Sequence, residues 1–172
     1  MNAKDIIIEE SLTSFFYRNL DRINKNSLHP LPEEFLWYSS EVLSDFAFTQ
    51  GVVHEKVLGM EFLEAQQKSI TEKKKIYKDI GDTTLVQLGL FPQRVNKKAV
   101  AESYYINIGK SAYAYLENLD CNFYDIPNFF KLLSTSFESM IGLLSDVREV
   151  TKFENFNHYL LSKSPINQNK AS

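Results

Sequence analysis

The stretch GDTTLVQLGLFPQRVNKKAVAESYYINIGKSAYAYL, residues 81–116, decides the fold of this chain. It holds three of the chain's six glycines and four of its nine tyrosines. Glycine inside a helix costs about 1 kcal/mol relative to alanine, yet the residues around Gly81 and Gly109 follow helical periodicity. We therefore expect both glycines where helices pack closely around a buried polar cluster, because a larger side chain would hold the helices apart.

Two predicted helices contain most of this stretch. Apolar side chains at spacings of three and four predict a helix over about 94–119. The sequence SITE at 69–72 matches a capping box, which predicts that another helix begins near residue 70. Gly89 and Pro92 are typical of a helix end, so this second helix is expected to stop near residue 90.

The same periodicity extends over most of the remaining chain, and no stretch alternates at period two. Further helices are predicted over about 4–24, 32–50, 53–67, 126–150 and 152–161. The sequence therefore predicts an all-α fold: a single-domain bundle of five to seven helices within residues 1–162. The polar segment 163–172 lacks apolar periodicity, and we expect it to be disordered.

Composition narrows the class of protein. The chain is 44% hydrophobic and 24% charged, as in ordinary globular proteins, and its 13% aromatic content predicts an aromatic-rich core. A net charge of -3 gives no electrostatic case for non-specific binding to nucleic acid or to an anionic membrane. Cys121 is the only cysteine, which excludes an intrachain disulfide and a cysteine-based zinc site. We therefore expect a reducing compartment, with the cytoplasm as the default.

Sequence motifs of common enzymes are absent. The chain has no Gly-x-Gly for a nucleotide-binding loop and no Gly-x-Ser-x-Gly for a serine hydrolase. The sequence HEKVL at 54–58 begins like a zinc-protease motif but has Leu58 in place of the second histidine. We therefore expect no catalytic activity, no metal and no cofactor.

Three residues of the central stretch are candidates for a binding site. Asp82 lies one helical turn after Lys78, close to apolar side chains. It could form a surface salt bridge, accept hydrogen bonds from a tyrosine hydroxyl as a buried carboxylate, or bind a ligand. Tyr104 and Tyr105 are predicted on the inward side of their helix, where they either pack the core or line a pocket with Asp82.

A second candidate site lies in the run Phe35, Leu36, Trp37 and Tyr38. A helix cannot bury four consecutive residues on one stripe. Leu36 belongs to the predicted inner face of its helix, so its neighbours should turn toward another surface. Phe35, Trp37 and Tyr38 are therefore predicted to form an interface, either between two copies of the chain or with another protein.

Three motifs resemble a known family. They are LSDFAF (43–48), IGDTTLVQLGLFP (80–92) and YYINIGKSAYAYL (104–116). Together they are similar to the signature G-D-x-x-L-x-x-x-G-L-F followed by Y-Y-I-x-x-G-x-x-A-Y of uncharacterised helical bacterial proteins. The likeness covers roughly residues 36–120. It implies a bacterial origin and a helical fold, and it implies no activity.

The leading functional interpretation is a non-enzymatic protein-interaction or regulatory protein. Its expected partner is a second copy, as in a homodimer, or another protein, and neither nucleic acid nor a membrane. The alternative is a helical sensor domain that binds a small molecule. Its pocket would be lined by Tyr104, Tyr105 and Trp37, with Asp82 as the polar anchor.

Overall fold

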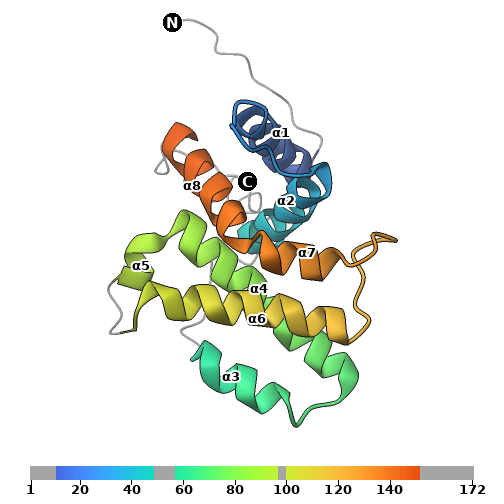
Figure 1. The fold of residues 1–172 in the computed structure, drawn as a ribbon. Helices are drawn as coiled ribbons and strands as arrows, with labels where there is room; N and C mark the ends of the chain where they lie inside the picture. The colour runs from blue at the N-terminus through green and yellow to red at the C-terminus, as the bar shows by residue number, and fades with distance from the viewer. Residues whose placement is uncertain (1–10, 49–56, 97–99, 152–172) are drawn as a thin grey trace, which may run out of the picture.

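A computed structural model of the chain describes residues 11–48, 57–96 and 100–151. Within these ranges it contains eight helices and no named strand, which confirms the predicted all-α fold (Figure 1). The helices are α1 (Leu12–Asn24), α2 (Glu33–Phe48), α3 (Leu58–Ala65), α4 (Ile70–Leu90), α5 (Pro92–Asn96), α6 (Glu102–Asn118), α7 (Phe129–Thr135) and α8 (Phe137–Thr151). The predicted helix at 152–161 and the predicted disordered segment at 163–172 lie outside the described residues.

The longest helix, α4, begins and ends as predicted. The Ser69 side chain accepts a hydrogen bond from the backbone N–H of Glu72, and the Glu72 carboxylate accepts one from the backbone N–H of Ser69. This reciprocal pair is the capping box, and it satisfies two backbone donors that a helix N-terminus leaves free. The helix ends at Leu90, directly before Phe91 and Pro92.

The single helix predicted over 126–150 is wrong, because the structure divides it into α7 and α8 at Ser136. Three hydroxyl side chains, at 134–136, lie at the junction. The Ser134 hydroxyl donates to the carbonyl of Lys110 at 2.8 Å, and the Thr135 hydroxyl donates to the carbonyl of Leu132 at 2.9 Å. Such side-chain bonds to the backbone compete with continuous helical pairing. Likewise, the helix predicted over 94–119 comprises α5 and α6.

The helices pack around α4, which contacts α6 and α8 extensively, while α1 packs against α2 and α8. In Figure 1, α3 lies at the edge of the molecule, beside α4 and α6 and away from α1. The core is rich in aromatic rings, as the composition predicts; its largest fully buried side chains include Phe16, Tyr38, Tyr77, Tyr113, Phe129, Phe130 and Phe137. Among the described residues, no helix combines the length and apolarity needed to cross a membrane.

Gly81 and Gly109 both lie at close helix contacts, as predicted. A Cβ placed on Gly81 of α4 would lie 2.5 Å from the ring of Tyr113 in α6. A Cβ placed on Gly109 of α6 would lie 2.3 Å from the ring of Phe137 in α8. Each distance is well inside van der Waals contact, so a larger side chain would displace the ring. Each of the two glycines therefore makes room for a different aromatic ring, Tyr113 at Gly81 and Phe137 at Gly109.

Candidate functional site

Asp82 joins side chains from three helices. Its Oδ1 accepts a hydrogen bond from the Tyr38 hydroxyl of α2 at 2.5 Å and another from the Tyr113 hydroxyl of α6 at 2.8 Å. Its Oδ2 lies 2.6 Å from Nζ of Lys78, one turn earlier in α4. The Asp82 side chain is only 17% exposed. Two of the three roles that the sequence left open, the ion pair and the tyrosine-bonded carboxylate, are therefore present together.

The environment of Asp82 raises the pKa values of the three side chains that it contacts. Burial, followed by the negative charge of Asp82, raises the pKa of Tyr38 and of Tyr113 well above the ordinary value for a phenol. Burial alone would lower the pKa of Lys78, but the charge of Asp82 and its hydrogen bond raise that pKa overall. At neutral pH the cluster therefore contains two neutral phenols and one ammonium.

Aromatic rings enclose the cluster on its buried side. The Tyr38 ring contacts the ring of Tyr113, with centroids 5.9 Å apart, and also meets the rings of Phe123, Phe129 and Phe130. The Lys78 ammonium lies 5.3 Å from the centroid of the Tyr38 ring. The two oxygens of Asp82 thus accept three hydrogen bonds within an aromatic core. This arrangement fits a structural hydrogen-bond network that links α2, α4 and α6 better than it fits a ligand-binding site.

Tyr104 and Tyr105 do not join Asp82. Tyr105 is buried in the core as predicted, whereas Tyr104 is 39% exposed, so its predicted inward position is wrong. The Tyr104 hydroxyl instead lies against Gly59 of α3. The hydrogen-bond partners of Asp82 are two other tyrosines and a lysine, so the three residues of the predicted pocket do not converge.

The predicted interface residues separate into two environments. Phe35 and Tyr38 are buried in the core, so their predicted place on an outer surface is wrong. The reason is that α2 packs against α1 on one side and meets the aromatic rings of α7 on another, so its buried arc is wide. Trp37 alone of the three is exposed, at 42%.

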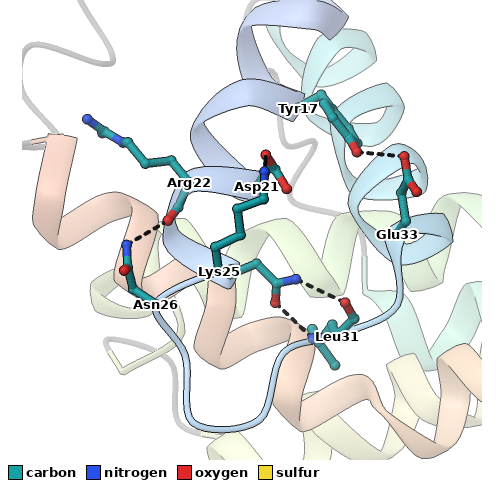
Figure 2. A network of polar contacts seen from close by, with 8 residues as sticks. Tyr17, Asp21, Arg22, Lys25, Asn26, Leu31 and Glu33 are labelled. Carbon is teal, nitrogen blue, oxygen red and sulfur yellow. Dashed lines mark hydrogen bonds and ion pairs between the residues drawn. The ribbon is translucent and has the colours of Figure 1, made fainter.

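Trp37 lies on the surface shared by α1 and α2. Its ring stacks on the Tyr17 ring of α1, with centroids 4.3 Å apart and planes inclined by 24°. The Tyr17 hydroxyl donates to the Glu33 carboxylate of α2 at 2.9 Å (Figure 2). Burial, then the hydrogen bond and charge of Glu33 and the charge of Asp21, raise the pKa of Tyr17 to about 12.

The loop between α1 and α2 is fixed by a side chain, which sets how these two helices meet. The Asn24 amide donates to the carbonyl of Leu31 at 2.9 Å and accepts from the backbone N–H of Leu31 at 2.8 Å. Asn24 is itself buried. This two-way bond imitates a backbone pair and holds the end of α1 beside the start of α2.

The short helix α3 exposes an aliphatic surface. Val57, Met60 and Leu63 follow one another at intervals of three residues and are 62%, 59% and 64% exposed. The opposite side of the helix carries the buried residues Leu58 and Ala65. An amphipathic surface helix normally has a polar outer face, so this outer face departs from the usual pattern.

Tyr113 was not among the predicted site residues, although the sequence carries a signal for its position. The buried residues of α6 are Tyr105, Gly109, Ala112, Tyr113 and Leu116. Once Gly109 is expected at a close helix contact, the residue four positions later should also face inward. Tyr113 could therefore have been predicted in the core. Tyr115, two residues further along α6, is 40% exposed.

Among the described residues, no group of three or more histidine, cysteine, aspartate or glutamate side chains is arranged to hold a metal ion. Comparison of the chain with models of known protein families, with curated proteins and with solved structures finds no significant match. The resemblance to a bacterial family therefore stays a prediction.

Proposed function

We propose that the chain is a non-enzymatic protein-interaction or regulatory protein that forms a homodimer through the outer surface of α3. The observation that carries the proposal is the exposed aliphatic row of Val57, Met60 and Leu63. Exposed apolar patches on soluble proteins commonly mark interaction sites.

The residues next to α3 extend this surface. Tyr104 and Tyr115 of α6 are both exposed, and both contact α3: Tyr104 lies against Gly59, and the Tyr115 ring packs edge-on against Phe62, with centroids 5.3 Å apart. With the three aliphatic residues, they account for five of the twelve exposed large hydrophobic side chains in the described residues. Tyrosine and methionine are enriched in interface cores, so this surface has a suitable composition.

The sensor alternative receives less support. Its anchor, Asp82, already accepts hydrogen bonds from Tyr38, Tyr113 and Lys78. A ligand that used this carboxylate would have to displace one of them and leave a buried hydroxyl or an ammonium without its partner.

Sedimentation of wild type and of Leu63→Glu tests the proposal. Burying a leucine side chain contributes about 1.5–3 kcal/mol, and a two-fold dimer buries Leu63 twice. Because Leu63 is already one-third covered in the monomer, the expected loss is about 2–4 kcal/mol, or a dissociation constant raised roughly 30-fold to 1,000-fold. The matched control is Leu132→Glu, which changes a half-exposed leucine on α7 and should leave the dimer intact.

Two results would contradict self-association through α3. The first is a wild type that stays monomeric at high micromolar concentration. The second is an equal effect of Leu63→Glu and Leu132→Glu on the dissociation constant, which would place the interface elsewhere.

A further inference from the structure

The exposed face of α2 carries an indole between two carboxylates. Glu33, Trp37 and Glu41 follow one another at intervals of four residues, so they lie along one side of the helix, each about 6 Å further along its axis. Each carboxylate is held by a tyrosine from another segment. Tyr17 of α1 donates to Glu33 at 2.9 Å, and Tyr124, from the segment before α7, donates to Glu41 at 2.9 Å.

These contacts connect the indole and the two carboxylates to tyrosines from other segments. The Tyr17 ring stacks on Trp37, and the Tyr17 hydroxyl donates a hydrogen bond to Glu33, so one side chain contacts both the indole and the carboxylate. Tyr124 is 71% exposed, and its backbone lies in the left-handed region at φ 50°, yet its hydroxyl is directed at Glu41. We name the five residues Tyr17, Glu33, Trp37, Glu41 and Tyr124 the acidic–aromatic surface.

Two of the five residues, Glu33 and Glu41, carry carboxylates, and the charge of Glu41 also helps to raise the pKa of Lys78 on α4. Hydrogen bonds from neutral phenols orient the carboxylates of Glu33 and Glu41 but leave their charges in place. Rigid aromatic rings beside fixed carboxylates are the groups that recognise a guanidinium, which stacks on a ring through its face and pairs with a carboxylate through its edge. Lysine offers only a point charge to such a surface, so arginine fits it better.

We propose that the acidic–aromatic surface binds an arginine-bearing segment of a different protein, with one guanidinium on Trp37 and its neighbours on Glu33 and Glu41. The 6 Å steps along α2 match arginines at every fourth position of a partner helix. The proposal is independent of self-association through α3, because the two surfaces share no residue.

Charge argues for a foreign partner rather than a second copy at this place. A two-fold contact centred on Trp37 would bring Glu33 and Glu41 of one copy against those of the other. The whole chain also carries a net charge of -3, which attracts a basic segment over long range.

The test uses the full chain and a synthetic helical peptide, based on alanine, with arginine at three positions spaced by four residues. Trp37 is the only tryptophan of the chain, so its fluorescence reports on this surface directly. Titration with the peptide should change the Trp37 emission. The affinity should fall as salt rises from about 50 to about 300 mM, because salt screens the attraction between the arginines and the two carboxylates. The same peptide with citrulline in place of arginine keeps the shape without the charge and should leave the emission unchanged.

Variants locate the site. The double variant Glu33→Gln/Glu41→Gln should weaken peptide binding at least tenfold, while glutamine retains an acceptor for both tyrosines. Glu34→Gln is the matched control, because Glu34 lies in the same first turn of α2 but about 100° around the helix from Glu33. It should change the affinity less than threefold. Circular dichroism of each variant checks that the helices are intact.

Three results would overturn the proposal. Equal binding of the arginine and citrulline peptides to wild type would show that charge recognition is absent, whatever the variants do. A free-energy loss in Glu34→Gln that is half the loss in the double variant would show attraction to net charge only, because the control removes one charge and the double variant removes two. A Trp37 emission that changes with the concentration of the chain alone would assign the surface to a second copy. Repeating the titration on Leu63→Glu keeps this outcome separate from the proposal for α3, because peptide binding should survive in that variant.

Discussion

Replacing Asp82 with alanine tests whether the hydrogen bonds of its cluster stabilise the fold. The substitution removes the acceptor of two hydroxyls, those of Tyr38 and Tyr113, which belong to fully buried side chains. A buried donor left without a partner costs about 1–3 kcal/mol, so the two together should cost about 2–6 kcal/mol. Lys78 adds little, since its side chain is 42% exposed and its ammonium can turn to water. Against a typical stability of about 5–15 kcal/mol, this loss is large.

Urea unfolding followed by far-ultraviolet circular dichroism measures the loss, and a second background isolates its cause. In a Tyr38→Phe/Tyr113→Phe chain the buried donors are gone, so adding Asp82→Ala should cost less than about 1 kcal/mol. Asp82→Asn should fall between wild type and Asp82→Ala, because the amide oxygen still accepts hydrogen bonds. An equal loss from Asp82→Ala in both backgrounds would refute the reasoning, since the cost could not then come from unpaired tyrosines.

Two further predictions concern packing and pH. Gly109→Ala should destabilise the fold by about 1–3 kcal/mol, because the added Cβ would meet the Phe137 ring. Gly142→Ala in α8 should stabilise it by about 0.5–1 kcal/mol, because a Cβ there meets nothing within 4 Å. Urea unfolding midpoints measure both changes, and a change of the same sign in the two variants would contradict the close contact at Gly109. The pKa values of Tyr38 and Tyr113 are raised in the fold, so their contribution is complete below about pH 10 and is lost as the pH rises above that value. The melting temperature should therefore fall above about pH 10, and less steeply in Tyr38→Phe/Tyr113→Phe; identical pH profiles would rule this out.

The helices of this chain were predictable because their signals are local. The capping box at 69–72 and the stop at Pro92 act through residues within one or two turns, and they set the bounds of α4. The division between α7 and α8 was missed because apolar residues keep the same phase across it, from Phe130 to Phe137. Only the hydroxyl run at 134–136 indicates the break, and its effect depends on a carbonyl of another helix.

The candidate site was predictable only where its partners are close in sequence. Lys78 lies four residues from Asp82 and was found, whereas Tyr38 and Tyr113 lie 44 and 31 residues away. Pairings over such distances depend on how the helices pack, which periodicity alone does not specify. The exposure of Trp37 follows from helix geometry, but its stacking on Tyr17 depends on the α1–α2 contact.

The two proposed surfaces differ in chemistry, so one variable separates them. Association through Val57, Met60 and Leu63 removes apolar area from water, and added salt does not weaken that contribution. Binding at Trp37 depends on the charges of Glu33 and Glu41, whose attraction salt screens beyond about 10 Å at 0.1 M and over shorter distances at higher salt. Raising the salt should therefore release a basic partner while the dimer persists. If both associations weakened together, the α3 contact would be electrostatic, and its aliphatic row would not be what holds the two copies together.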